Sequence, residues 1–252
     1  MDGEIVEVTD TEVCLILLKK IKNIRMGNSE NSNKELTVEQ IQEIAAQLRK
    51  PAGEMGVEMG HIMNEANVVM IDQTLETLQP FTGEAILEIG HGNANHLQKL
   101  IKMAPGIQYT GLDISETMHL EAKKYCAEND LESQTTFVHY EGQTIPFASQ
   151  TFDKIFTINT LYFWESPEAY LNELHRILKP GGKLLITYAE EESMDKLPFT
   201  SYGFTKYSPD KFEKLIQNSK FKLESNRQYV EKINSKVLTY DERKFRVGVL
   251  MC

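Results

Sequence analysis

From residue 85 onward, short apolar runs alternate with amphipathic segments, and this alternation predicts an α/β fold. The runs are rich in Ile, Leu, Val and Phe, as strands buried on both faces are, whereas the segments between them carry apolar residues at helical spacing. Strands that alternate with helices form a mostly parallel sheet covered by helices on both faces. The last two runs are expected to complete the sheet as an antiparallel hairpin. The predicted strands are residues 85–89, 108–113, 135–140, 152–159, 183–186, 223–230 and 245–251.

The residues before the first strand fall into two parts. Thr37 and Gln40 have the spacing of a capping box and begin a helix that ends before Pro51, and a second helix is expected over residues 59–80. Residues 1–34 combine an acidic opening with a polar run that can bury almost nothing, so we expect an irregular or disordered extension there. The predicted divisions of the chain are therefore 1–34, 35–82 and 83–252.

Composition narrows the class of protein. A chain of 252 residues with 41% hydrophobic content can bury one large core. The formal net charge of −10 opposes binding to the phosphates of nucleic acid or to an anionic membrane. Cys14, Cys126 and Cys252 are far apart, which argues against a disulfide framework or a zinc site. No apolar run approaches the length of a membrane span, so we expect a cytoplasmic protein without a bound metal.

A glycine-rich turn connects the first predicted strand to the amphipathic segment that follows it. Gly90 and Gly92 flank His91 in this turn. Glycine adopts backbone angles closed to other residues and lets amides approach a ligand closely, and the next helix presents free N–H groups. The turn is therefore typical of a loop that binds a nucleotide, although a plain turn between strand and helix also needs a glycine.

A carboxylate stands at the end of the next predicted strand, about 20 residues beyond the glycines. This is where nucleotide-binding α/β units place the acid that accepts hydrogen bonds from the ribose hydroxyls. Asp113 occupies the position. Ser115 is at least as well placed to cap the following helix, which leaves Asp113 free for a ligand.

A third sequence feature indicates which nucleotide the predicted loop would bind. In residues 178–186, Pro and Gly end a predicted helix and an apolar strand then begins. An earlier apolar run, residues 152–156, precedes that helix. Together with the glycine turn and Asp113, these segments resemble the class I S-adenosylmethionine (SAM) dependent methyltransferases. More narrowly, they are similar to the small-molecule branch that includes the menaquinone and ubiquinone biosynthesis methyltransferases. The resemblance is strong over residues 83–188 and implies a Rossmann-like, seven-stranded sheet, with residues 35–82 as a helical cap over a SAM-binding domain.

The resemblance also implies a function and a set of binding residues. SAM is the implied cofactor, and a small molecule is the implied acceptor of its methyl group. Because the cofactor already carries the activated group, the family has no universal catalytic residue. Glu88 would order the turn and approach the methionine ammonium. The residues implied to bind the cofactor are Glu88, Gly90, Gly92, Asp113, Ile114, Glu141, Gly142 and Asn159.

The chain departs from the family pattern at three positions. The third glycine position is Ala94, and Glu141 stands where the family usually has Asp. His91 is unusual between the glycines; it is a weak candidate for a general base, although such a side chain more often points outward from the loop. Tyr162 is a second weak candidate, in an aromatic run that would otherwise form an apolar wall for the acceptor.

Two alternative functions stay open at the level of the sequence. A nucleotide-binding oxidoreductase would share the strand, turn and carboxylate, although Asn95 replaces the third glycine of the dinucleotide motif. A non-catalytic SAM-binding protein would keep the fold without turnover. The acceptor and the oligomeric state do not follow from the sequence.

Overall fold

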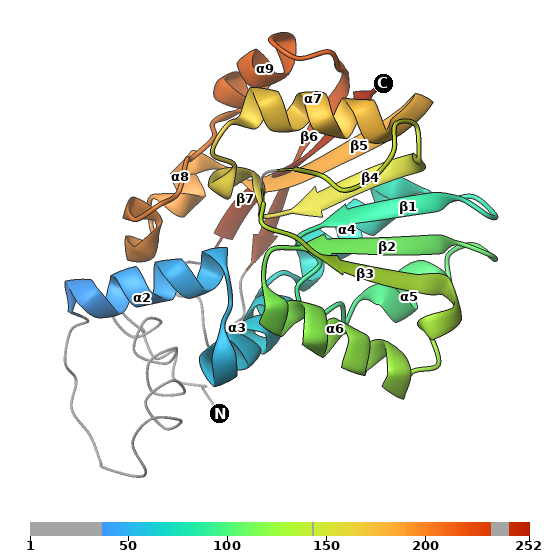
Figure 1. Ribbon diagram of the computed structural model, residues 1–252. Coiled ribbons are helices and arrows are strands. Elements are labelled where there is room, and N and C mark those ends of the chain that lie inside the picture. The colour runs from blue at the N-terminus through green and yellow to red at the C-terminus, as the bar shows by residue number, and fades with distance from the viewer. Residues whose placement is uncertain (1–36, 143, 233–241) are drawn as a thin grey trace, which may run out of the picture.

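The computed structural model describes residues 37–142, 144–232 and 242–252, and within these residues the chain forms one seven-stranded sheet (Figure 1). Five strands run parallel and the last pair adds the antiparallel edge, which confirms the predicted fold class. The strand order is β3-β2-β1-β4-β5-β7-β6. The strands are β1 (Ala85–Ile89), β2 (Gln108–Asp113), β3 (Thr135–His139), β4 (Phe152–Ile158), β5 (Leu178–Ala189), β6 (Lys222–Lys232) and β7 (Glu242–Met251).

Helices cover both faces of the sheet, as the apolar strands require. Successive residues of a strand point to opposite faces, so Leu87 packs with α7 and α9, whereas Ile86 packs with α4, α5 and α6. The central strands are buried on both sides, which explains why they read as continuous apolar runs. The helices are α4 (Val68–Leu78), α5 (Leu97–Ile101), α6 (Glu116–Glu128), α7 (Pro167–Ile177) and α9 (Pro209–Gln217).

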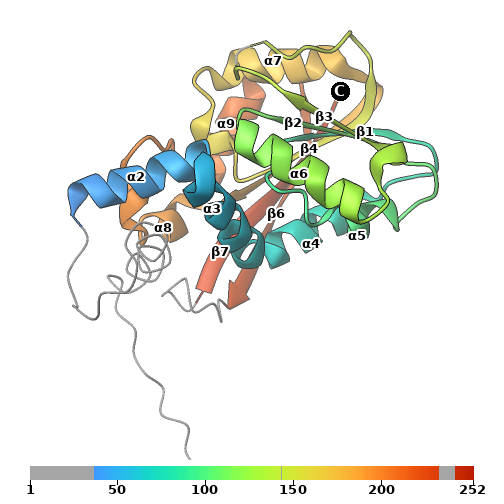
Figure 2. The ribbon, with the colours of Figure 1, turned by 60° about the horizontal axis from the view of Figure 1, so that its bottom comes forward.

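The N-terminal helices lie beyond the carboxyl ends of the parallel strands (Figure 2). Helix α2 (Val38–Arg49) begins with the predicted capping box, in which Thr37 and Gln40 bond each other's backbone amides. The single helix expected over residues 59–80 is wrong, because two helices are present. Helix α3 (Gly53–Ala66) starts earlier than predicted and ends at Asn67, where α4 begins in a new direction.

Close packing explains why α3 contains glycines. A Cβ atom at Gly56 would lie 2.6 Å from the backbone carbon of Pro51, and one at Gly60 would lie 2.9 Å from Met118 Sδ. Glycine normally weakens a helix interior, but here it lets α3 pack against its own N-terminal turn and against α6. The glycine-containing residues 53–60 are therefore helical.

The segment after β5 folds over the same edge of the sheet. It contains α8 (Glu191–Met194) and the short 3₁₀ helix η3 (Pro198–Ser201). Phe199 of η3 is buried in a small apolar cluster with Ile44 of α2 and with Met59 and Ile62 of α3. We refer to α2, α3 and η3 as the cap. The predicted extension at residues 1–34 lies outside the described residues.

Candidate functional site

One cavity of about 710 Å³ lies at the carboxyl ends of the parallel strands, between the glycine turn and the cap. Ligand sites in open α/β sheets occupy this edge. The cavity brings together all ten residues proposed from the sequence: Glu88, Gly90, His91, Gly92, Asp113, Ile114, Glu141, Gly142, Asn159 and Tyr162.

The glycine turn needs glycine for two different reasons. Gly90 has a φ of 72°, and a Cβ atom there would lie 2.4 Å from Thr160 Cγ2. Gly92 has a φ of 56°, but its Cβ would meet no described atom within 4 Å. Gly90 therefore permits close packing of the end of β1 against the residues after β4. Gly92 instead leaves open space on the cavity side of the turn. Ala94 also has a positive φ, of 57°, and is fully buried.

Asp113 connects the end of β2 to the turn. Its Oδ2 accepts a hydrogen bond from the backbone N–H of Gly92 at 3.0 Å, and its Oδ1 accepts one from the N–H of Ser115 at 2.8 Å. Ser115 caps α6 by accepting from the N–H of Met118, as the sequence predicts. Each carboxylate oxygen of Asp113 can still accept a further hydrogen bond, because a carboxylate oxygen offers two lone pairs.

Glu88 is buried to 2% exposure at the end of β1. Its Oε2 accepts a hydrogen bond from the Tyr109 hydroxyl at 2.6 Å and lies 2.8 Å from His96 Nε2. Burial, reinforced by the charge of Glu88, raises the pKa of Tyr109 well above its usual range, so this phenol is a permanent donor. Asp113, rather than Glu88, accepts the hydrogen bond from the backbone N–H of Gly92 in the turn. The contacts of Glu88 hold its side chain against β2 and the start of α5.

Three further predicted residues meet at the ends of β2 and β3. Gly142 has a φ of 85°, and a Cβ atom on it would lie 3.3 Å from Ile114 Cγ2. Glu141 is exposed beside them at the cavity. The hydroxyls of Tyr140 and Tyr170, which also line the cavity, lie 2.6 Å apart, and burial raises the pKa of Tyr140 to about 12.

His91 does not point outward, contrary to the commoner behaviour of such loop residues. The side chain is buried against Phe137 in an edge-to-face contact, and its Nδ1 lies 2.7 Å from the carbonyl oxygen of Gly92. The Nε2 atom is buried and has no hydrogen-bond partner among the described residues. The ring occupies space beside Gly111, where a Cβ atom would lie 2.6 Å from His91 Cδ2.

A second polar group lines the cavity at the end of β4 and the start of β7, and its hydrogen bonds have a defined direction. Arg243 Nη1 lies 3.0 Å from Asn67 Oδ1. A guanidinium only donates, so the Asn67 atom facing it must be the carbonyl oxygen. Asn159 Nδ2 donates to the same oxygen at 3.1 Å and lies 3.4 Å from Met70 Sδ. Asn159 therefore uses both of its N–H groups within the protein.

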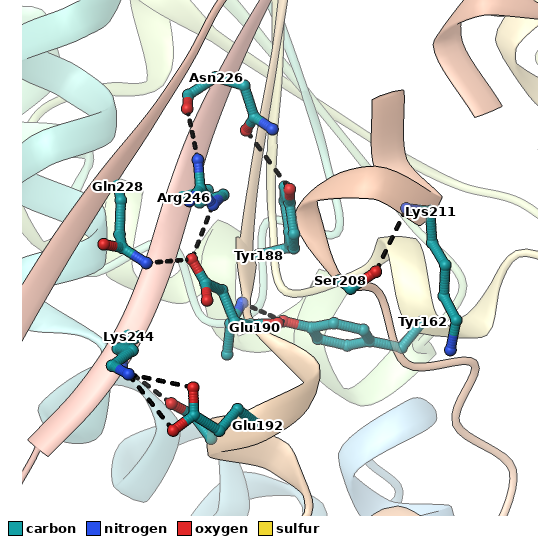
Figure 3. Close-up of polar contacts among 12 residues, drawn as sticks. Tyr162, Tyr188, Glu190, Glu192, Ser208, Lys211, Asn226, Gln228, Lys244 and Arg246 are labelled. Atoms are coloured by element: carbon teal, nitrogen blue, oxygen red, sulfur yellow. Dashed lines mark hydrogen bonds and ion pairs between the residues drawn. The ribbon is translucent and has the colours of Figure 1, made fainter. Parts of the chain in front are cut away.

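The direction of the hydrogen bonds at Tyr162 follows in the same way. Its oxygen accepts a hydrogen bond from the backbone N–H of Ala189 at 2.5 Å, and its hydroxyl donates to Asn159 Oδ1 at 2.9 Å. Figure 3 shows the bond between Tyr162 and the end of β5. These contacts make Tyr162 an anchor that holds Asn159, which has a left-handed backbone with φ of 59°.

Arg243 was not among the predicted binding residues. For Asn67 the helical pattern favours a solvated position, although its amide could reach the methionine end of the cofactor. Arg243 is buried at the start of β7, where it forms an ion pair with Glu231 of β6 and donates to the carbonyl oxygen of Ala66 at 2.7 Å. The sequence places Asn67 inside a helix and Arg243 in a hairpin, 176 residues apart. The charged pair in an otherwise strand-like hairpin was the only available signal.

A polar cluster around the buried side chain of Glu190 holds the hairpin onto β5 (Figure 3). Glu190 Oε1 accepts hydrogen bonds from Arg246 Nε and Gln228 Nε2, each at 2.6 Å. Arg246 also donates to the carbonyl oxygen of Asn226 at 2.7 Å. Because these contacts join the end of β5 to β7 and β6, they fix the position from which Arg243 reaches the cavity.

Known proteins resemble this chain over the same region. A family model described as "Methyltransferase domain" matches residues 87–186. An uncharacterized methyltransferase, YdaC of Bacillus subtilis, is 28% identical over 134 residues, which cover 53% of this chain and 72% of that protein. The ubiquinone/menaquinone biosynthesis C-methyltransferase UbiE of Cereibacter sphaeroides is 29% identical over 138 residues, 54% of each chain. This chain thus matches only about half the length of the UbiE proteins.

A solved structure shares the fold. The SAM-dependent methyltransferase from Aquifex aeolicus has a TM-score of 0.59 and 19% identity, over 77% of this chain and 97% of that one. These comparisons favour neither an oxidoreductase nor a non-catalytic protein.

The residues present fit SAM. Glu88 and Asp113 offer carboxylates to a ligand that carries an ammonium group and ribose hydroxyls, and Gly92 leaves the turn open. Asn93 Nδ2 is buried without a partner among the described residues, so it is a donor available to the ligand's carboxylate. Residues 87–186 thus match a methyltransferase-domain family and share the fold of a SAM-dependent methyltransferase, with SAM as the cofactor, and the chain that carries them is similar to the ubiquinone/menaquinone biosynthesis C-methyltransferases.

Proposed function

We propose that the chain transfers the methyl group of SAM to a small, largely apolar acceptor bound beneath the cap. One observation carries the proposal: a single cavity is lined by the predicted cofactor residues and by an apolar wall, which residues of the cap and of the segments after β4 and β5 form. A cavity with an apolar wall and a few polar groups is typical of small-molecule sites. The apolar and aromatic residues of that wall are Met59, Met63, Phe163, Trp164, Met194, Leu197, Phe199 and Phe204.

Within the proposal, the carboxylates position the cofactor. Asp113 accepts from the ribose hydroxyls through its remaining lone pairs, with Ile114 and Gly142 against the adenine and Glu141 near its amino group. Glu88 attracts the methionine ammonium. Each assignment follows from the predicted role and from the position of the residue at the cavity.

The cofactor supplies an activated methyl group, and the protein supplies alignment and exclusion of water. The cap covers the cavity with apolar residues, which favours the dry environment that displacement at a sulfonium needs. Asn159, held by Tyr162, follows β4 next to the glycine turn and faces the reaction centre. Neither His91 nor Tyr162 has the contacts of a free general base, because one ring is packed behind the turn and the other hydroxyl donates to Asn159. The proposal therefore favours an acceptor that is itself nucleophilic.

The remaining predictions belong to the same proposal. Residues 35–82 form a helical segment that covers the domain formed by residues 83–252, and the protein works in the cytoplasm on a small molecule rather than on nucleic acid. The charge of −10 supports that substrate class. No helix among the described residues is long and apolar enough to cross a membrane.

The test combines binding and turnover. Calorimetry with S-adenosylhomocysteine should show saturable binding to the wild type and at least a tenfold weaker binding to Asp113→Asn, which keeps the shape of the side chain but loses its charge. Radiolabelled SAM with a panel of apolar aromatic, aliphatic and polar acceptors should then show transfer to members of the apolar classes. Transfer only to polar acceptors or to RNA would refute the acceptor class. Absence of cofactor binding by folded protein would refute the proposal as a whole.

A further inference from the structure

Asn67 presents the cavity with a hydrogen-bond donor whose direction is fixed by the protein. Its Oδ1 accepts from Arg243 Nη1 and Asn159 Nδ2, so its Nδ2 must face the other way. Asn67 is half-buried and lines the cavity, and its Nδ2 donates to no acceptor among the described residues. A donor held in this way is complementary to an oxygen with lone pairs.

We propose that Asn67 Nδ2 binds an oxygen atom of the methyl acceptor and so determines which acceptors are used. This inference rests on the proposed function and specifies one polar contact within it. The apolar wall holds the body of the acceptor, and Asn67 selects for a carbonyl or ether oxygen on that body. A site built to donate a hydrogen bond rejects an analogue without the oxygen, because the donor is then left unpaired.

Two features favour the acceptor, rather than the cofactor, as the ligand of Asn67. Asp113 ends β2 and Glu88 lies in β1, whereas Asn159 follows β4 and Arg243 begins β7. The sheet order β2-β1-β4-β5-β7 therefore puts Asn67, through its two partners, on the side away from Asp113. The cofactor's carboxylate has another unpaired donor, Asn93 Nδ2, within the glycine turn itself.

Arg243 and Glu231 act on the acceptor only through Asn67. Arg243 bonds Glu231, Ala66 and Asn67 at the same time, so all three sides of the guanidinium are engaged. Without a purely donating partner, the amide of Asn67 can turn over and present its oxygen to the cavity. The ion pair with Glu231 balances the charge of Arg243, so the site favours a neutral acceptor over an anionic one. Arg243 is thus a positioning residue.

The test measures binding of a matched pair of probes to protein saturated with S-adenosylhomocysteine. 2-Acetylnaphthalene carries a carbonyl that only accepts hydrogen bonds, and 2-isopropenylnaphthalene has the same shape without the oxygen. In equilibrium dialysis, the wild type should bind the ketone about tenfold more tightly than the alkene, the ratio expected for one well-made hydrogen bond. Asn67→Asp keeps the oxygen that Arg243 and Asn159 need but replaces the donor by an acceptor. It should abolish or reverse the preference and change the affinity for S-adenosylhomocysteine less than about twofold.

Two further variants complete the comparison. Gln217→Glu adds the same charge on the exposed end of α9 and should keep the wild-type preference. Arg243→Lys retains a purely donating group and should keep it too, whereas Arg243→Gln combined with Glu231→Gln should weaken it while the double variant still binds S-adenosylhomocysteine. If Asn67→Asp does not fold, Asn67→Ala removes the donor without adding charge and should lose the preference.

Each outcome bears on the inference. Equal binding of both probes by the wild type, or an unchanged preference in the Asn67 variants, overturns it. Loss of S-adenosylhomocysteine binding in these variants overturns it in favour of a cofactor contact. Failure of the wild type to bind either probe overturns the inference together with the apolar acceptor class. Methyl transfer that is insensitive to Asn67→Asp overturns the inference alone, whereas a ketone preference without any transfer supports it and refutes the proposed function.

Discussion

Replacing Gly90 by alanine should destabilise the protein more than the same change at Gly92, and the structure gives the reason. Both residues have positive φ, which costs a non-glycine residue about 1–2 kcal/mol. Only at Gly90 would the new methyl collide, 2.4 Å from Thr160 Cγ2, which adds about 1–3 kcal/mol of overpacking. The reduced entropy of the unfolded alanine chain offsets part of both penalties and cancels in the comparison. The expected difference in the free energy of unfolding is therefore about 1–3 kcal/mol.

Thermal and urea unfolding measure this difference. At about 2–4 °C per kcal/mol for a protein of this size, Gly90→Ala should melt roughly 2–12 °C below Gly92→Ala. Thr160→Ser removes the colliding methyl but keeps the hydroxyl that lies 2.5 Å from Thr157 Oγ1. The double variant Gly90→Ala with Thr160→Ser should therefore recover most of the difference. Equal melting temperatures for the two single variants, or no recovery in the double variant, would refute the steric argument.

The same pair of variants separates stability from binding. Because the Cβ of Gly92→Ala meets open space at the cavity, this variant should fold well but lose affinity for S-adenosylhomocysteine by an order of magnitude or more. Calorimetry on the folded variant gives that number. Wild-type affinity in Gly92→Ala would show that the cofactor does not approach the turn at this residue.

Three other properties follow from the structure. Ala94→Gly should raise the free energy of unfolding by up to about 1 kcal/mol in urea titrations, because it relieves a positive φ in a buried turn; a loss of stability would contradict the strain. Stability should fall as pH rises above about 10, because burial raises the pKa of Tyr140 to about 12 and the pKa of Tyr170 well above its usual range, so the unfolded chain loses these protons first. Melting temperatures that stay flat from pH 9 to 11 would count against this expectation. Arg243→Met should lower the free energy of unfolding, measured in urea, by about 3–5 kcal/mol, because the Glu231 carboxylate stays buried without its partner. Adding Glu231→Leu should restore much of this free energy. A small effect of the single change would show that water reaches the ion pair.

The strands and their order of appearance follow from the sequence because each is an apolar run bounded by turn residues. A strand such as residues 85–89 is buried on both faces, so its pattern depends little on its partners. The start of α7 at Pro167 and of α6 after Ser115 are likewise local, since capping chemistry lies within one turn of the helix.

The break at Asn67 depends on residues far away in the sequence. Helical spacing continues across Asn67, and nothing nearby requires the chain to turn there. The side chain bonds Asn159 and Arg243, which reach it only after the sheet has formed. Local patterns cannot show such a contact, and the buried ion pair of Arg243 likewise becomes visible only when β6 and β7 are paired.

The packing of His91 over Gly111 restricts how this protein can evolve. The imidazole fills the volume that a side chain on the neighbouring strand would occupy, with Phe137 closing the other side. A larger residue at position 111 is therefore tolerated only after position 91 has become small, whereas a small residue at position 91 leaves a hole until position 111 grows. The two positions form an epistatic pair with an obligatory order of steps. A transplanted glycine turn that carries a small residue at position 91 should therefore leave a cavity here unless position 111 is exchanged with it.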